Sequence, residues 1–356
     1  MNKRVVVAMS GGVDSSVAAA LLKQQGYDVI GVTMCLGVDG SGSSKPARGK
    51  TAGRPNCCGA EGIADAKRVA DILGIRHYVL DFGKVFRKEV IDSFFGDYSR
   101  GRTPNPCVIC NEKVKFGGLL RTAEELDAEY FATGHYADID RDNGNLLRKA
   151  KDAKKDQTYF LYRVNPEILR KVLFPVSRHK KSEIRKMARE LQLPISDKPD
   201  SQEICFIPEK GLEEALDSNV KPKPGQVKDM AGNVLGKHRG IAYYTIGQRK
   251  GLGIAAERPL YITDIDAKTN TITVGDKEDA FRKSFEIKDV VFYGNNKENG
   301  KYSVRIRYLH KEAPAEVVFS GDRAEIEFNE PQFAVTPGQS AVFYKDDCVY
   351  GGGIIE

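Results

Sequence analysis

Two spacings of apolar residues alternate along the first 200 residues. Short apolar runs predict buried strands, and apolar positions three or four residues apart predict amphipathic helices. The predicted strands cover 4–9, 27–35, 77–81 and 130–133. The predicted helices pass through Val13, Val17, Ala20 and Leu21, through Ala66, Val69, Ala70 and Leu73, and through 85–95. This alternation predicts an α/β domain with a parallel sheet and helices on both faces.

The pattern changes after residue 208. A Pro- and Gly-containing stretch at 221–225 predicts a stiff break. Short strands with turn residues between them follow, at 261–263, 271–274, 304–308, 315–319, 324–328 and 340–344. We therefore predict an α/β domain at 1–208, a small central domain at 209–275 and a C-terminal β-barrel at 276–356.

Composition narrows the class of protein. A hydrophobic fraction of 41% supports sizeable cores. No apolar run reaches the roughly 18–20 residues of a membrane span, and the N-terminus lacks a signal-peptide pattern. Seven cysteines in 356 residues are too sparse for a secreted disulfide framework. We expect a cytoplasmic, monomeric protein with no membrane contact. Its net charge of +6 alone does not establish a nucleic-acid partner.

The most informative segment is Ser10-Gly-Gly-Val-Asp-Ser15, between the first strand and the first helix. Its glycines allow close approach to an anion, the helix N-terminus favours negative charge, and Ser10, Ser15 and Ser16 offer hydroxyl donors. No Gly-Lys-Ser/Thr follows, so this is not a Walker loop. The alternative is an ordinary tight strand–helix turn. The whole string resembles the PP-loop of ATP pyrophosphatases, which implies ATP, Mg²⁺ and adenylation chemistry.

Two cysteine sites stand out. Cys107 and Cys110 lie in a Pro-rich loop expected to precede a helix, which would place Cys110 near a helix N-terminus that stabilises a thiolate. Cys205 lies between Ile204 and Phe206. The alternatives are half of a zinc knuckle for the first pair and a small core residue for Cys205. We assign no catalytic role to the remaining cysteines, which are Cys35, Cys57, Cys58 and Cys348.

Two segments concentrate positive charge. Residues 178–189 hold six basic residues and one acid, with a buried face expected on Ile184, Met187, Ala188 and Leu191. Residues 236–251 hold four basic residues and no acid, interleaved with Tyr243 and Tyr244. Phosphate contacts and aromatic stacking are how proteins commonly hold RNA. The alternative is solvated surface charge.

Taken together, these motifs make the chain closely similar to the bacterial tRNA-specific 2-thiouridylase (MnmA) family. The resemblance extends over nearly the whole length. The matching segments are 10–15, 101–106 with Cys110 and Asn111, 132–137, 155–161, 200–206, 245–253 and 339–356.

The resemblance implies ATP-dependent sulfuration of C2 of the wobble uridine in tRNA. It also implies three parts, which are a PP-loop domain, a small central domain and a β-barrel. The positions that match the family's ATP contacts are Ala8, Met9, Ser10, Gly11, Gly12, Val13, Asp14, Ser15, Met34 and Gly134. Those that match its tRNA contacts are Asn105, Pro106, Cys107, Lys155, Asp156, Gln157, Arg307 and Tyr308.

The resemblance also implies roles for cysteines. Cys110 matches the family's nucleophile and Cys205 its persulfide carrier, which a sulfur-donor protein must load. Adenylation turns the poor leaving oxygen of a uracil carbonyl into AMP, and release of sulfur from Cys205 needs a second thiol, the role of Cys110.

The sequence departs from the family in two places. Cys107 stands where the family commonly has Asp, so Cys107, Cys110 and Cys205 are possible ligands of a [4Fe–4S] cluster. Alternatively, Cys107 simply replaces the aspartate and is able to form disulfides on oxidation. The second departure is a Gly/Ser-rich insert at 37–56.

Two other function classes compete with this interpretation. One is a PP-loop enzyme that amidates an adenylate with ammonia, although no glutaminase domain is visible and such enzymes need no paired cysteines. The other is a non-enzymatic RNA-binding iron–sulfur protein with a degenerate loop. The presence of Ser10, Asp14 and Ser15 argues against it.

Overall fold

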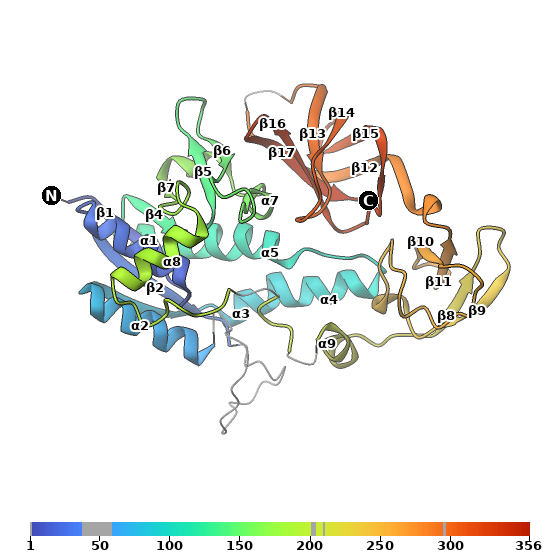
Figure 1. The fold of residues 1–356 in the computed structure, drawn as a ribbon, viewed down its shortest axis with the longest axis horizontal. Helices are drawn as coiled ribbons and strands as arrows, with labels where there is room; N and C mark the ends of the chain where they lie inside the picture. Colours follow the sequence, from blue (N-terminus) through green and yellow to red (C-terminus); the bar gives the residue numbers. More distant parts are fainter. Residues whose placement is uncertain (1, 38–58, 201–203, 209–210, 295–296) are drawn as a thin grey trace. The chain divides into compact units, whose positions relative to one another are not determined.

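The chain forms two compact units. A computed structural model describes residues 2–37, 59–200, 204–208, 211–294 and 297–356 (Figure 1). The first unit comprises 1–91, 106–211 and 347–349, and the second comprises 92–105, 212–346 and 350–356. No helix within the described ranges is both long and apolar enough to cross a membrane.

A five-stranded parallel sheet organises the first unit, with strand order β3-β2-β1-β4-β7. The strands are β1 (Arg4–Ala8), β2 (Asp28–Cys35), β3 (Arg76–Asp81), β4 (Tyr130–Thr133) and β7 (Val172–Leu173). Val5, Val6 and Val7 of β1 are fully buried, as expected for a central strand covered on both faces. A hairpin of β5 (Ala137–Asp140) and β6 (Leu146–Lys149) follows β4.

Helices connect these strands. They are α1 (Val13–Gln24), α2 (Ala60–Leu73), α3 (Gly83–Phe86), η1 (Arg87–Ile91), α5 (Pro106–Ile109), η2 (Cys110–Leu119), α6 (Leu120–Glu125), α7 (Thr158–Leu161), η3 (Pro166–Lys171) and α8 (Lys181–Glu190). Segments η1 and η2 are π-helical, a form frequently found at functional sites. Gly74 ends α2 in the left-handed conformation, with φ of 57°.

The second unit contains a four-stranded sheet and a closed barrel. The sheet has the order β10-β11-β8-β9, and the barrel is closed by pairing of β12 with β17. The sheet strands are β8 (Gly225–Lys228), β9 (Val234–His238), β10 (Tyr261–Asp266) and β11 (Thr271–Gly275). The barrel strands are β12 (Phe281–Phe292), β13 (Gly300–Arg305), β14 (Ala313–Ser320), β15 (Arg323–Phe333), β16 (Ser340–Lys345) and β17 (Cys348–Ile355). Its helices are α4 (Asp92–Ser99), α9 (Leu212–Asn219), η4 (Ile241–Tyr243) and η5 (Glu278–Ala280).

The predicted fold class is confirmed: a parallel α/β domain, a central domain and a C-terminal β-barrel. Two local predictions were wrong. The strand expected at 304–308 lies at Gly300–Arg305, and the loop expected up to residue 110 ends at Pro106, where α5 begins. Proline fits this first helical position, because its missing N–H needs no partner there. All but the first residue of the 37–56 insert, as well as Cys57 and Cys58, lie outside the described residues.

Candidate active site around the glycine loop

The glycine loop connects β1 to α1 at the carboxyl edge of the sheet. Gly12 is the N-cap residue of α1 and has no side chain, so the first-turn N–H groups receive no hydrogen bond from their N-cap residue. The backbone N–H of Ser10 donates to Ser15 Oγ (3.2 Å), which holds the turn closed. Ser16 is fully buried and its hydroxyl donates to Gly12 O (2.8 Å). The expectation that Ser16 donates to a phosphate was therefore wrong, because its hydroxyl is already used inside the turn.

Two glycines allow close backbone contacts around this loop. Gly11 has a φ of 71°, and a Cβ there would collide with the carbonyl oxygen of Gly62 in α2. A Cβ on Gly134, directly after β4, would lie 2.5 Å from Ser15 N and 2.7 Å from Asp14 C. Both positions therefore require glycine, which brings α2 and the end of β4 against the loop.

An ion-pair network surrounds Asp14, the carboxylate of the loop. Lys181 Nζ, from the first residue of α8, donates to both carboxylate oxygens of Asp14 at 2.7 Å. Tyr136 Oη donates to Asp14 Oδ1 at 2.8 Å. Burial and the neighbouring Asp14 charge raise the pKa of Tyr136, so this phenol remains a protonated donor.

Asp200 extends the network away from the loop. It accepts from Lys155 (2.7 Å) and Arg185 (2.8 Å) and pairs with Lys181 (2.8 Å). Burial alone would raise the pKa of Asp200, but the hydrogen bonds from Lys155 and Lys181 lower it to about 2. Asp200 is therefore ionised at neutral pH. The roles of Lys181, Tyr136 and Asp200 were not predicted, because contacts across 167 residues leave no trace in local spacing.

The remaining predicted ATP residues lie on β1 and β2 beside the loop. Ala8 ends β1, and the Met9 carbonyl accepts from Thr33 Oγ1 at 2.7 Å. Met34, the last but one residue of β2, is 7% exposed. Because the side chains of Met9 and Met34 are buried, a nucleotide would reach mainly their backbone.

His135 follows Gly134 and is held in its neutral form. Lys115 Nζ lies 3.4 Å from Nε2 and can only donate, so Nδ1 carries the proton and donates to Thr133 Oγ1 at 2.7 Å. Burial and the Lys115 charge hold the pKa of His135 well below its usual range. This histidine is a neutral, positioned side chain at the carboxyl end of β4.

The cysteines predicted to be catalytic belong to the first unit. Cys107 is exposed in α5, whereas Cys110 and Cys205 are half-buried. Phe206 packs edge-on against Phe86 of α3 (5.9 Å), and α3 packs against η2, whose first residue is Cys110. Because the helical run begins at Pro106, Cys110 lies one turn inside it rather than at its start. The thiol closest to the N-terminus of this helical run is that of Cys107, the second residue of α5.

The structure also bears on metal binding by these cysteines. Within the described part of the chain, no three side chains of His, Cys, Asp or Glu form a group able to hold a metal ion. Cys107, Cys110 and Cys205 are therefore not grouped as ligands of a single metal ion, and their role as ligands of a [4Fe–4S] cluster stays a prediction.

Three consecutive residues predicted to contact tRNA differ in their surroundings. Lys155 keeps 35% of its side chain exposed although it pairs with Asp200. Asp156 is 3% exposed and accepts from Thr158 Oγ1 at 2.8 Å. Gln157 Oε1 accepts from the Tyr136 backbone N–H at 2.8 Å. Lys155 is thus more accessible than Asp156, while Asp156 and Gln157 hold neighbouring residues of the site in place.

Other predicted tRNA residues belong to the second unit. Arg307 Nη1 donates to Phe333 O (2.9 Å), which fixes the β13–β14 loop that also carries Tyr308. The loop that ends at Asn105 is held by Gln339 Nε2, which donates to Thr103 O (2.8 Å). Thr103 Oγ1 lies 3.1 Å from Thr245 Oγ1. Parts of three segments that carry the family resemblance, 101–105, 245–253 and 339–346, therefore meet within this unit. Pro106 begins the first unit's next segment.

The basic segment at 178–189 proved less available than expected. Ile184 and Ala188 are fully buried with Met187 and Leu191 packed beside them, as predicted. However, Lys181 and Arg185 turn toward Asp14 and Asp200, and Arg189 and Lys186 pair with Asp197 (2.9 Å) and Glu190 (3.6 Å). Much of the positive charge on this helix is therefore already paired.

The segment 236–251 keeps exposed cations near both of its ends. Tyr244 is 6% exposed and belongs to the core of the central sheet, so it is not available to stack on a base. Arg239 lies over the Tyr243 ring (4.0 Å) and pairs with Glu213. Lys237, Arg249 and Lys250 are exposed. These residues are accessible positive charges that an RNA phosphate would meet.

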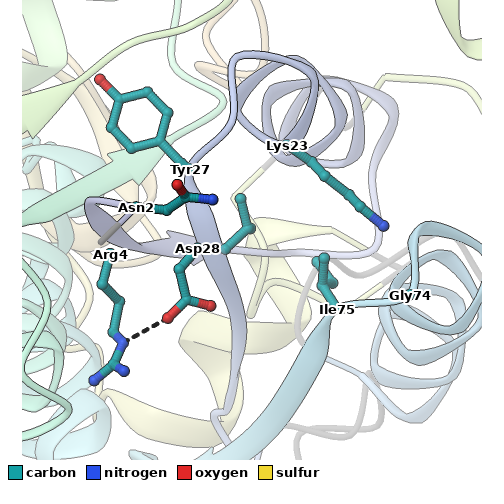
Figure 2. Close-up of a pocket in the computed structure, with 8 residues that line it drawn as sticks. Asn2, Arg4, Lys23, Tyr27, Asp28, Gly74 and Ile75 are labelled. Carbon is teal, nitrogen blue, oxygen red and sulfur yellow. Dashed lines mark hydrogen bonds and ion pairs between the residues drawn. The ribbon is translucent and has the colours of Figure 1, made fainter.

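A cleft of about 540 Å³ lies at the end of the sheet where the strands begin (Figure 2), whereas the glycine loop follows the end of β1. Arg4 and Asp28 form an ion pair in it at 2.8 Å, and Lys23 and Tyr27 line it from the end of α1 onward. It lies at the amino ends of β1 and β2. In parallel sheets ligands bind at the carboxyl ends, so this cleft is not the candidate active site.

Three family models match the chain in succession. They are described as the tRNA methyl transferase HUP domain at 3–209, the tRNA methyl transferase PRC-barrel domain at 213–276 and the aminomethyltransferase beta-barrel domain at 282–355.

Curated relatives match over the full length. The tRNA-specific 2-thiouridylase MnmA 2 of Thermoanaerobacter sp. (strain X514) is 47% identical over 364 residues, covering 100% of this chain and 98% of that protein. The chain belongs to the MnmA family. The MnmA protein of Clostridium perfringens (strain ATCC 13124) is also 47% identical, over 99% of this chain and 98% of its own length. MnmA 1 of Caldanaerobacter subterraneus subsp. tengcongensis is 47% identical, with coverage of 100% and 98%.

MnmA membership confirms the resemblance found in the sequence. The names of the first two matching domain families mention methyl transfer, whereas the full-length relatives are named 2-thiouridylases. The two descriptions differ in the group transferred, and an experiment can distinguish them.

Proposed function

We propose that the chain is a tRNA-uridine 2-sulfurtransferase that thiolates C2 of the wobble uridine at the expense of ATP. The main support is that one compact unit holds both halves of the chemistry. It combines a glycine turn at an uncapped helix N-terminus with Cys110 and Cys205 on neighbouring elements. An amidating synthetase would need the loop but not the cysteines.

The first proposed step is adenylation of the uridine. The C2 oxygen attacks the α-phosphorus of ATP, the bond from that phosphorus to the bridging oxygen breaks, and pyrophosphate leaves with the electron pair. The ATP site comprises Ala8 to Ser15 with Met34 and Gly134. The uncapped N–H groups of α1 and the Ser10 hydroxyl are suited to bind the phosphates. Mg²⁺ enters bound to ATP and needs few protein ligands.

The second proposed step is sulfur transfer. The terminal sulfur of a persulfide on Cys205 attacks C2, and AMP leaves with the former carbonyl oxygen. The Cys110 thiolate then attacks Sγ of Cys205, which releases the thiocarbonyl and leaves a Cys110–Cys205 disulfide. A thiol reductant restores both thiols, and a sulfur-donor protein reloads Cys205. This proposed route uses a persulfide on Cys205 and has no step on an iron–sulfur cluster.

The tRNA is proposed to contact Asn105, Pro106, Cys107, Lys155, Arg307 and Tyr308. Asp156 and Gln157 would act indirectly, since Asp156 is buried and Gln157 holds Tyr136. Arg249 and Lys250 add exposed positive charge for phosphate contacts.

Product analysis with cysteine variants tests this mechanism. With α-labelled ATP and tRNA, the enzyme should release AMP and pyrophosphate. Cys110→Ser and Cys205→Ser should each abolish thiolation while ATP binding remains. Cys348→Ser, a change in a half-buried cysteine of β17, serves as the control and should thiolate normally. Release of ADP would overturn adenylation, and normal thiolation by Cys205→Ser would remove it as the sulfur carrier.

A further inference from the structure

Lys181 brings a positive charge to the glycine loop from a distant part of the chain. Its ammonium lies 2.7 Å from both oxygens of Asp14 and 2.8 Å from Asp200 Oδ1, and its side chain is 12% exposed. Asp14 is the second residue of α1, so Lys181 reaches the same helix N-terminus that carries the uncapped N–H groups. A mostly buried ammonium at this position is a feature of the loop itself, not a solvated surface charge.

The electrostatics of the loop require such a cation. ATP carries several negative charges, and the Asp14 carboxylate would repel them if it were unpaired. The helix N-terminus contributes only partial positive charge. Lys181 offsets the Asp14 charge. Its ammonium has three N–H donors and sits on a flexible stem, so one donor can turn from a carboxylate to a phosphate oxygen.

Asp200 fixes where this ammonium lies. It binds Lys181 on one side, and it also accepts from Lys155 and Arg185. The Lys181 backbone N–H donates to Asp152 Oδ2 at 2.9 Å, so the residue is held at both its backbone and its side chain. The position of the ammonium is therefore set before any nucleotide binds.

We propose that Lys181 is a phosphate-binding residue of the ATP site, which holds the departing pyrophosphate, and that Asp200 is its positioning residue. This inference rests on the proposed function, because it assigns a ligand to the same loop. Neither residue belongs to the glycine motif. The sequence marked Lys181 only as part of a basic cluster, and Asp200 only as the first residue of the matching segment 200–206. The site thus extends from the loop to α8.

The test measures binding of inorganic pyrophosphate and of a non-hydrolysable ATP analogue by calorimetry. Lys181→Gln, which retains a donor next to Asp14 but no charge, should weaken pyrophosphate binding by about tenfold or more. Adenosine binding should change little, because adenosine has no phosphate. Lys181→Arg should retain most of the affinity. Lys186→Ala is the matched control on the same helix, since Lys186 is 77% exposed and pairs with Glu190.

A double-mutant cycle tests the positioning role. Asp200→Asn should weaken pyrophosphate binding in the native background but have little further effect in Lys181→Gln. Equal effects in both backgrounds would show that Asp200 does not act through Lys181. Thermal unfolding of each variant identifies loss of fold, and if Lys181→Gln does not fold, Lys181→Met replaces it.

The outcomes separate this inference from the proposed function. If the native protein binds pyrophosphate and the ATP analogue, and Lys181→Gln binds them equally well, the inference is wrong while the proposed function stands. If the native protein binds neither ligand, the proposed ATP site fails as well.

Discussion

At the scale of single side chains, the neighbouring residues Lys155 and Asp156 have different surroundings. Lys155 is partly exposed and pairs with Asp200, whereas Asp156 is buried. Asp156 Oδ1 lies 3.4 Å from Ala150 N, and its Oδ2 accepts from the Thr158 hydroxyl. The carboxylate therefore ties the start of α7 to the residue after β6. Family resemblance marked both positions as tRNA contacts, but only burial and hydrogen bonding distinguish them.

Asp156→Ala should lower the stability of the fold. It should not change the salt dependence of tRNA binding, because the buried carboxylate does not face the RNA. The substitution removes the carboxylate that accepts from the buried Thr158 hydroxyl at 2.8 Å, and losing such a buried hydrogen bond costs about 1–3 kcal/mol. Urea unfolding measures this change, with Asp142→Ala, an exposed residue, as the control. An unchanged unfolding free energy, together with a reduced salt dependence of tRNA binding, would instead assign Asp156 to the RNA interface.

At the scale of elements, the sequence predicted the helices and strands whose apolar residues recur with a clear local spacing. The strands at 4–9, 27–35, 77–81 and 130–133 and the helix through Ile184 and Ala188 were found, because each has a strong local periodicity. Strand β12 was missed because its residues Arg282 to Ser284 are polar and interrupt the apolar alternation. The Asp14–Lys181–Asp200 network was missed because only the tertiary fold brings α8 to the loop. The ATP loop was thus predictable, and the charges around it were not.

The contact between β4 and α1 leads to a prediction at Gly134. A methyl group there would overlap the backbone of Asp14 and Ser15, which cannot move without shifting the start of α1. Gly134→Ala should cost about 1–3 kcal/mol of stability and weaken binding of an ATP analogue. Gly96→Ala is the control, because a Cβ there meets nothing closer than 3.8 Å. Retention of native ATP affinity by Gly134→Ala would show that the loop tolerates this displacement.

At the scale of the whole molecule, the described chain contains several histidines kept neutral by burial. Burial lowers the pKa of His77, His135, His238 and His310. His238 is 2% exposed, and its Nδ1 accepts from Gly240 N while Nε2 donates to Asn270 O, both at 3.0 Å. Protonation of Nδ1 would break the first of these bonds.

Stability should therefore fall as pH drops below the ordinary histidine pKa of 6.5. There the unfolded chain takes up protons that the folded chain does not, so the unfolded state is favoured. Each histidine that stays neutral contributes up to about 1.4 kcal/mol per pH unit. Urea unfolding at pH 7.5, 6.5 and 5.5 measures the slope, and His238→Asn should make it shallower. Constant stability over this range would contradict the neutral assignment.

The central claim is that this protein replaces the C2 oxygen of a tRNA uridine with sulfur in an ATP-dependent reaction. The most direct measurement incubates it with unmodified tRNA, Mg²⁺-ATP and a persulfide-loaded sulfur donor, then digests the tRNA for nucleoside mass spectrometry. We predict 2-thiouridine at the wobble position, formed only when ATP is present. Formation of a methylated uridine, or of no thionucleoside although ATP and tRNA both bind, would contradict the account.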